Sequence, residues 1–328
     1  MYNTLLFSLA SDNLWLNAVL IIAGIAVVIW GADRMTEGAT RIAERLKVPQ
    51  VVIGLTIVAF GTSMPEFCVS LVSALKNTAD LAIGNVIGSN IFNTLLIVGA
   101  SALVAPITIL KKTVRRDMAF SFIASLALML MIVLTGEISR LSAALLFAGL
   151  IIFMYTMIRD ARKEKTETSA IPSEERVKEH PMLVSVGLVI LGLVCLVAGS
   201  NVFVDNATAV AQSLGVSEAV IGLTIVAGGT SMPELATSVV AARKGQSGIA
   251  IGNVLGSNVM NILFILGVTG LISPMQVNGI TIVDLITLIL SMLVLWLFSA
   301  TKLTVERWEG GILLALFTGY MAWLFMNI

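Results

Sequence analysis

The feature that most constrains this chain is a series of long apolar runs. Each is long enough to cross a bilayer as a helix, which takes about 20 residues. The runs follow one another along the whole chain, separated by short polar stretches. They predict an all-α integral membrane protein with ten transmembrane helices, near residues 14–32, 48–75, 81–104, 117–135, 140–158, 182–202, 217–242, 249–271, 281–300 and 309–326.

Composition agrees with a chain that lies mostly in lipid. Charged residues make up 12% of the sequence, whereas soluble domains carry about 25%. The net charge is zero, which gives no electrostatic support for a nucleic-acid partner. Cys68 and Cys195 both lie inside apolar runs. Two isolated cysteines make neither a disulfide framework nor a metal site, so we expect buried, unreactive side chains.

The distribution of basic residues predicts the orientation. If the N-terminus lies outside, ten spans place 18 of the 20 Lys and Arg residues in the cytoplasm, and only Lys76 and Arg140 fall outside. Such a bias is what the positive-inside rule describes. We therefore expect a multi-pass protein with its N- and C-termini outside, located in the plasma membrane, or in the inner membrane of a bacterium.

An internal repeat divides the chain into two halves. Residues 54–99 and 222–267 align without a gap at an offset of 168, with 28 of 46 positions identical. Each half holds five predicted spans, and because five is odd the second half enters the membrane from the opposite side. The sequence thus predicts two inverted five-helix repeats, residues 1–158 and 182–328, joined by a polar cytoplasmic linker at 159–181.

Two acidic residues lie inside the predicted spans, away from loops and span ends. They are Glu66 and Glu234, which are related by the offset of 168. A charge at that depth costs several kcal/mol, so a carboxylate there needs a cation, a proton or a buried partner. No Lys or Arg lies at the same depth. The alternatives are a cation site and a pair of protonated, hydrogen-bonded glutamates.

Each glutamate follows a proline in the segment Gly-Thr-Ser-Met-Pro-Glu, at 61–66 and 229–234. Proline lacks an N–H group and breaks the helical hydrogen bond to the carbonyl four residues back. The freed carbonyls near Gly61 and Gly229 need another partner in lipid. Broken helices of this kind bind ions in transporters, although Thr or Ser hydroxyls at a simple kink would also satisfy these carbonyls.

A second polar motif follows in each half. It reads Gly-Asn-x-x-Gly-Ser-Asn-x-x-Asn, at 84–93 and 252–261. Ser89 and Asn93 are four residues apart and share one helix face. These groups are either hydrogen-bonding contacts between helices or cation ligands. Because the atoms available here as metal ligands are all oxygens, the cluster suits hard cations such as Ca²⁺. Two carboxylates neutralise one Ca²⁺ or two Na⁺.

The doubled motifs resemble the α-repeats of the cation/Ca²⁺ exchanger superfamily, in its sodium/calcium exchanger branch of prokaryotic type. The resemblance implies an antiporter that exchanges Na⁺ for Ca²⁺ by alternating access, with sliding of the first and sixth spans. It implies no cofactor beyond the transported ions. Carried over position by position, the ion ligands fall on Ala59, Thr62, Ser63, Glu66, Ser89, Asn93, Ala227, Thr230, Ser231, Glu234, Ser257 and Asn261, with the alanines acting through their carbonyls.

Three positions bear on the transported ion. Potassium-dependent members of the family carry Asp where this chain has Asn261, so K⁺ cotransport is disfavoured. Proton-coupled members usually place an acid where this chain has Ser89 and Ser257. A Ca²⁺/H⁺ exchanger, a K⁺-dependent exchanger and a passive channel or scaffold remain alternatives.

An enzyme is not expected, since the sequence has no nucleophile–base pair or nucleotide motif. We expect the lipid bilayer, and no obligate protein, as partner.

Overall fold

The computed structural model describes residues 13–76, 78–169, 181–215, 225 and 227–326. Within these residues, eight helices are long and apolar enough to cross a membrane, or nine if a bent helix pair counts as one span. The expected helical membrane protein is therefore confirmed. Ten spans remain a prediction, because part of the predicted span 217–242 lies outside the described residues.

The helices and strands of the two halves follow a similar order, although α2, η1 and η3 have no counterparts among the described residues of the second half. The first half comprises α1 (Leu14–Leu46), α2 (Gln50–Ile53), η1 (Gly54–Val58), α3 (Ala59–Thr62), α4 (Met64–Leu75), α5 (Ala79–Ile91), η2 (Phe92–Ile97), α6 (Val98–Val104), β1 (Ile107–Thr108), η3 (Thr113–Asp117), α7 (Met118–Thr135), β2 (Glu137–Ile138) and α8 (Arg140–Ser169). The second comprises α9 (Met182–Ser213), α11 (Ala227–Thr230), α12 (Met232–Arg243), α13 (Ser247–Val259), η5 (Met260–Ile265), α14 (Leu266–Ile272), β3 (Met275–Gln276), α15 (Ile282–Lys302), β4 (Thr304–Val305) and α16 (Arg307–Met326). The segments labelled η are π-helical.

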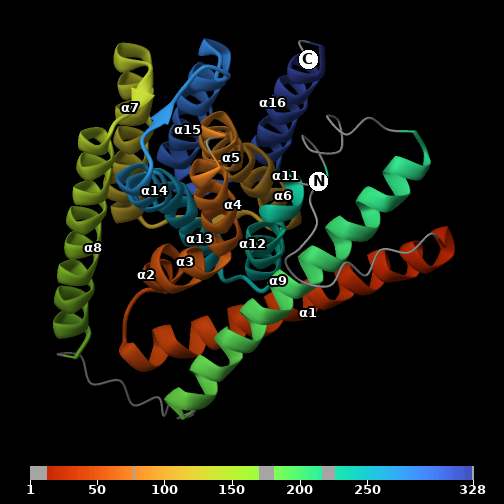
Figure 1. Ribbon diagram of the computed structural model, residues 1–328. Helices are drawn as coiled ribbons and strands as arrows, with labels where there is room; N and C mark the ends of the chain where they lie inside the picture. The colour runs from red at the N-terminus through yellow and green to blue at the C-terminus, as the bar shows by residue number, and fades with distance from the viewer. Residues whose placement is uncertain (1–12, 77, 170–180, 216–224, 226, 327–328) are drawn as a thin grey trace.

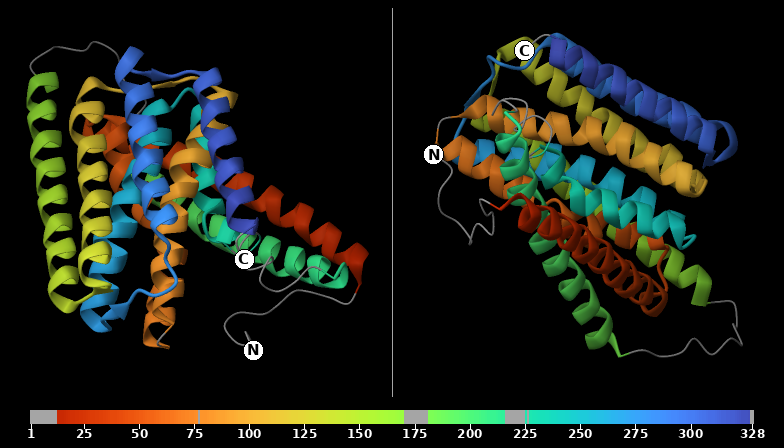
Figure 2. Two further views of the ribbon diagram at one scale, coloured as in Figure 1. Left: turned by 90° about the horizontal axis from the view of Figure 1, so that it is seen from above. Right: turned by 90° about the vertical axis from the view of Figure 1, so that its right-hand side faces the viewer.

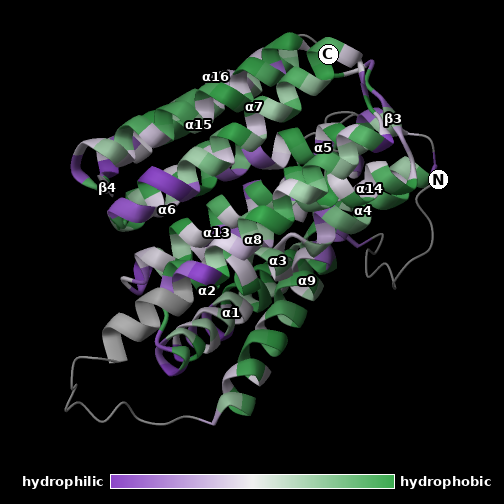
Figure 3. Ribbon diagram, turned by 90° about the vertical axis from the view of Figure 1, so that its left-hand side faces the viewer, coloured by the Kyte–Doolittle hydropathy of each residue, from purple (hydrophilic) through white to green (hydrophobic). Residues whose placement is uncertain are grey.

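One span lies at the centre of the bundle. In the segment Ser247–Ile272, which contains α13, 94% of the apolar window is buried, against 17% in α16. The central helix, which carries the polar motif at 252–261, is buried by protein, whereas most of the apolar surface of the outer helices is not. Figure 1 places α7, α8, α15 and α16 around α13. Figure 3 shows hydrophobic residues along these outer helices and hydrophilic residues near β3 and β4.

The long helices α1 and α9 lie side by side and project beyond the other helices at one end, while their other parts contact α12 (Figures 1 and 2). Gly24, Gly31 and Gly38 recur every seven residues along α1 and therefore share one face. A Cβ atom at Gly31 would lie 2.9 Å from the Gly192 carbonyl oxygen of α9, and one at Gly24 would lie 2.9 Å from that of Gly199. Small residues let helix backbones approach closely in membranes, and this is why the two helices pack as a tight pair.

Two short antiparallel sheets, which the all-α prediction omitted, join the two halves. Ile107 of β1 pairs with Val305 of β4, and Glu137 of β2 pairs with Gln276 of β3. The four strands lie in connections between helices, where backbone groups outside a helix need partners. Each sheet thus ties a connection of one half to a connection of the other.

Three helices extend beyond the predicted spans. The helix α1 continues to Leu46, α9 to Ser213 and α8 to Ser169, so the first part of the predicted linker, 159–169, continues α8 as a helix. Hydropathy finds only the apolar part of a helix. The polar end of α1 is supported by ion pairs from Arg34 and Arg41 to Glu37, at 2.9 and 2.5 Å. The rest of the predicted linker lies outside the described residues. Cys68 is exposed, which corrects the expectation of a buried thiol.

Candidate functional site

Both proline segments break their helices as predicted. Gln50–Thr62 and Met64–Leu75 meet at an angle of 47° around Ser63, and Ser231 separates α11 from α12 in the same way. Glu66 and Glu234 consequently lie in the first turn of α4 and α12. The partial positive charge of a helix N-terminus stabilises a carboxylate there. The breaks thus provide a favourable backbone field for two glutamates that lack a basic partner.

One freed carbonyl has a protein partner. The hydroxyl of Ser200, on α9, donates a hydrogen bond to the carbonyl oxygen of Gly229. A hydroxyl thus satisfies this carbonyl, as the simple proline kink predicts, while the second lone pair of the carbonyl oxygen stays available. The hydrogen bond from Ser200 also links α9 directly to the broken helix of the second half.

The two glutamates are buried and are bound across the repeat. Each has 1% of its surface exposed. The Ser231 hydroxyl donates to Glu66 Oε1 at 2.9 Å, and the Ser63 hydroxyl donates to Glu234 Oε1 at 3.0 Å. Ser257 lies 3.4 Å from the same Glu234 oxygen. Each carboxylate is therefore held by the helix break of the opposite half, and the described residues give neither of them an ion pair.

The remaining predicted residues come from the same elements. The Thr62 hydroxyl lies 3.3 Å from the Ala59 carbonyl oxygen. The Ser231 hydroxyl lies 3.3 Å from the Ser89 hydroxyl. Thr230 interacts with the Glu66 carboxylate, and Ala227 begins α11. The structure thus gathers polar groups from both broken helices and from the motifs at 84–93 and 252–261 around Glu66 and Glu234.

Four buried oxygens in this cluster have no hydrogen-bond partner. They are Oε2 of Glu66 and Glu234 and Oδ1 of Asn93 and Asn261, and they form two pairs related by the offset of 168. A buried acceptor left unpaired costs about 1–3 kcal/mol, so four of them in one region need an explanation. Two are carboxylate oxygens and two are amide oxygens, which are the ligand types of hard cations. Their chemistry fits a bound cation.

Two asparagines of the site were not among the predicted ligands. The amide of Asn85 donates to the backbone carbonyl of Glu66 at 3.1 Å, and that of Asn253 donates to the carbonyl of Glu234 at 3.2 Å. They fix the backbone that carries the carboxylates. Their presence at the same place in both repeat motifs was the sequence signal for a shared role.

The π-helical segments were also not predicted. Asn93 lies in η2 (Phe92–Ile97) and Asn261 in η5 (Met260–Ile265), and the two segments are related by the repeat offset. Single turns of π-helix occur frequently at functional sites. Apolar periodicity does not distinguish π-helix from α-helix, so these segments could not be predicted from hydropathy.

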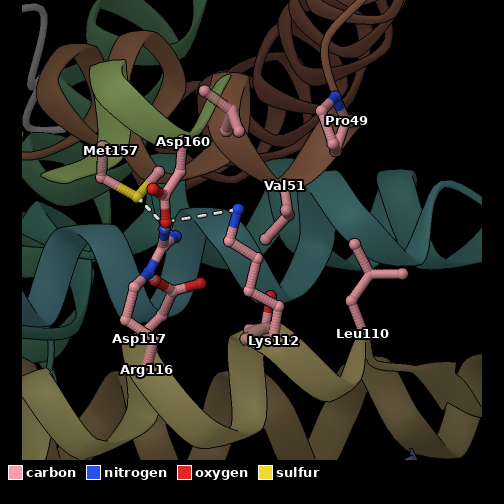
Figure 4. A pocket seen from close by; sticks show the side chains of 10 residues that line it. Pro49, Val51, Leu110, Lys112, Arg116, Asp117, Met157 and Asp160 are labelled. Atoms are coloured by element: carbon pink, nitrogen blue, oxygen red, sulfur yellow. Dashed lines mark hydrogen bonds and ion pairs between the residues drawn. The ribbon is translucent and has the colours of Figure 1, made fainter. Parts of the chain in front are cut away.

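A pocket elsewhere in the molecule has different chemistry (Figure 4). It lies where η3 and the residues just before it meet α8 and the beginning of α2. Arg116 is bound to Asp117 at 2.6 Å and to Asp160 at 2.5 Å, and Lys112 lies 3.3 Å from Asp160. Both carboxylates already have basic partners, so this is an ion-pair cluster that joins helix ends and not a second cation site.

Comparison with known proteins identifies the family and agrees with the fold. A family model described as sodium/calcium exchanger protein matches residues 16–159 and 184–326. The chain is 35% identical to the putative antiporter CaxA of Alkalimonas amylolytica, covering 94% of this chain and 98% of the relative. It is 31% identical to the sodium/calcium exchanger MaX1 of Methanosarcina acetivorans, with the same coverage of 94% and 98%.

The fold resembles that of a solved exchanger. A structure of the sodium-calcium exchanger NCX_Mj, soaked with zero Na⁺ and Ca²⁺, matches 95% of this chain and 100% of its own, with a TM-score of 0.82 and 30% identity. These relatives are transporters and not enzymes. Since the family model covers both halves and the relatives align over nearly the whole length, the chain belongs to the sodium/calcium exchanger protein family.

Proposed function

We propose that the protein exchanges Na⁺ for Ca²⁺ across the membrane through the cluster around Glu66 and Glu234. The observation that carries the proposal is the set of four buried oxygens without hydrogen-bond partners. Two ionised carboxylates carry a charge of −2, which one Ca²⁺ or two Na⁺ would neutralise. Competition of the two ions for one site follows from that charge, and a Na⁺ gradient would then drive Ca²⁺ movement.

The proposed ligand set matches what Ca²⁺ requires. Ca²⁺ takes 6–8 oxygens at about 2.3–2.6 Å, whereas Mg²⁺ gives up its waters reluctantly. Carboxylates, amides, hydroxyls and backbone carbonyls together offer enough oxygens. The proposed ligands are the twelve residues predicted from the sequence: Ala59, Thr62, Ser63, Glu66, Ser89, Asn93, Ala227, Thr230, Ser231, Glu234, Ser257 and Asn261.

We further propose ten spans in two inverted halves, residues 1–158 and 182–328, with both termini outside. The sheets support this arrangement. In the proposed topology β1 and β4 lie in cytoplasmic connections, whereas β2 and β3 lie in external ones, and the strands pair in these combinations. Each pairing requires an even number of spans between its two strands, and the proposed topology has six between β1 and β4 and four between β2 and β3.

Alternating access would use the α1–α9 pair as its moving part. Polar contacts join the pair to the rest of the protein. Lys244, at the end of α12, binds Asp33 Oδ1 of α1 at 2.6 Å, and Ser200 of α9 binds the Gly229 carbonyl. Such contacts can be exchanged for others when the pair slides, while the glycine packing keeps α1 and α9 together.

The experiment is ⁴⁵Ca²⁺ uptake into proteoliposomes that contain the purified protein. Vesicles loaded with Na⁺ and diluted into Na⁺-free buffer should accumulate Ca²⁺, whereas choline-loaded vesicles should not. Uptake driven by a pH gradient would identify a Ca²⁺/H⁺ exchanger, and dependence on K⁺ would identify a K⁺-dependent one. Uptake that needs no counter-ion would support a channel and refute the antiport.

Variants then test the site. Glu66→Gln and Glu234→Gln should each abolish Ca²⁺ uptake while the protein remains folded, because each removes one of two charges that balance the ion. Glu309 is a matched control. It is also buried, with 4% exposure, and lies in the first turn of α16, where its carboxylate accepts from the Glu306 N–H at 2.7 Å. Glu309→Gln should transport normally. Normal exchange by both site variants would refute the assignment.

A further inference from the structure

Two asparagines that are not proposed ligands lie between the halves, beside Asn93 and Asn261. They are Asn90 at the end of α5 and Asn258 at the end of α13, with 1% and 2% exposure. Asn261 Nδ2 donates to Asn90 Oδ1 at 3.0 Å. Asn93 Nδ2 donates to Asn258 Oδ1 at 3.2 Å. The two contacts are related by the repeat offset, and each crosses from one half to the other.

These contacts determine which end of each amide faces the site. An asparagine amide has a donor end and an acceptor end, and its orientation follows from its hydrogen bonds. Because the nitrogens of Asn93 and Asn261 are engaged, their oxygens point elsewhere, and both oxygens are buried without a partner. If either amide turned over, two oxygen acceptors would face each other and an NH₂ group would replace the free oxygen. A cation would be repelled by that NH₂ group.

The orienting asparagines are themselves held in place. Asn90 Nδ2 donates to the backbone carbonyl of Asn258 at 3.2 Å. Asn258 Nδ2 donates to the Thr94 hydroxyl at 2.9 Å. Since both nitrogens are used in this way, the oxygens of Asn90 and Asn258 must face the partner amides. The repeat position of Thr94 in the second half is Ile262, which has no hydroxyl, and this explains why Asn90 uses a backbone carbonyl instead.

We infer that Asn90 and Asn258 are positioning residues, each of which orients the amide of a cation ligand in the opposite half. Asn90 turns the oxygen of Asn261 toward the transported cation, and Asn258 does the same for Asn93. The inference rests on the proposed cation site. Groups that orient metal ligands contribute strongly to affinity, and their loss typically costs 10–100-fold. We expect Ca²⁺ affinity to depend on two residues that do not touch the ion.

The test is a double-mutant cycle on the purified full chain, with Ca²⁺ binding measured by calorimetry. Asn90→Ala should weaken binding about 10-fold or more. In an Asn261→Ala background the same change should cost less than about twofold, because the amide it orients is absent. Asn93 is the matched control, since Asn90 makes no hydrogen bond to it in the described structure. In an Asn93→Ala background the full loss should persist.

A conservative variant separates orientation from simple packing. Asn90→Asp keeps the acceptor for Asn261 but lacks the donor to the Asn258 carbonyl, so it should bind Ca²⁺ at least as well as wild type. If Asn90 acted only through its Nδ2 donor, the Asp and Ala variants would lose the same Ca²⁺ affinity. The midpoint of thermal unfolding without ions is recorded for each variant. If Asn90→Ala does not fold, Asn258→Ala with Asn93→Ala forms the symmetric cycle.

The outcomes are distinct. Equal losses from Asn90→Ala in the wild-type, Asn93→Ala and Asn261→Ala backgrounds would overturn the positioning role and leave the proposed exchanger intact. A wild-type chain that binds neither Ca²⁺ nor Na⁺ would overturn the proposed function and this inference together. If Asn90→Ala lowers Ca²⁺ affinity in the wild-type and Asn93→Ala backgrounds but not in the Asn261→Ala background, the positioning role is established.

Discussion

The packing of α1 against α9 makes a quantitative prediction at Gly192. A Cβ atom at this position would lie 2.6 Å from the Gly31 carbonyl oxygen, 2.6 Å from the Met35 nitrogen and 2.7 Å from Met35 Cβ. Optimal contacts between carbon atoms are about 3.5–4.0 Å, so Gly192→Ala has to separate the helices by roughly 1 Å. The opposing atoms are mostly backbone and cannot rotate away.

The same helix supplies the control. A Cβ atom at Gly187, five residues earlier on α9, has no described atom within 4 Å. Both substitutions gain the helix propensity of alanine over glycine, about 1 kcal/mol, and this term cancels in the comparison. The difference is the overpacking cost, typically about 1–3 kcal/mol. The backbone contacts place Gly192→Ala at the upper end, about 3 kcal/mol less stable than Gly187→Ala.

The assay is thermal unfolding in detergent, followed by the fraction of protein that remains monodisperse. Each kcal/mol corresponds to about 2 °C for large domains, so the midpoint for Gly192→Ala should lie about 6 °C below that for Gly187→Ala. Both are heated at one rate, because irreversible unfolding makes the midpoint depend on rate. Equal midpoints, or a higher one for Gly192→Ala, would refute close backbone packing of α1 on α9.

Three further predictions concern the site and the contact that holds α1. Asn261→Asp adds a third carboxylate and should change the ratio of ²²Na⁺ efflux to ⁴⁵Ca²⁺ uptake; an unchanged ratio and ion preference would place residue 261 outside the site. Gly256→Ala puts a Cβ atom 2.6 Å from that of Ala59, and should weaken Ca²⁺ binding about 10-fold by displacing the ligands of α3; wild-type affinity would contradict this. Lys244→Met removes the ion pair with Asp33, which is partly exposed, so it should lower stability by less than about 1 kcal/mol, and the difference should vanish at about 1 M salt, where such pairs are screened. A loss that persists in salt would indicate packing and not charge.

From the sequence alone we could predict a helical protein that lies in a membrane and could propose where its cation site lies. Hydropathy identifies spans because lipid requires long apolar segments, and the offset of 168 exposes the repeat without any coordinates. Glu66 and Glu234 could be singled out because a charge inside a span is costly wherever the chain folds. The proline breaks at 65 and 233 were predictable for a similar reason, since the missing N–H group is a covalent property of the residue.

Only the tertiary structure decided which atoms meet. The sequence placed Asn90 and Asn258 in a motif but could not say that each orients an amide of the opposite half, 171 and 165 residues away. The Ser200 bond to the Gly229 carbonyl and the cross-half sheets likewise depend on segments far apart in the chain. The cost of burying a charge depends on the residue itself, so the sequence was enough to propose the ligands. The direction of a hydrogen bond depends on the partner that packing brings close, so the orientation of the ligand amides could not be predicted.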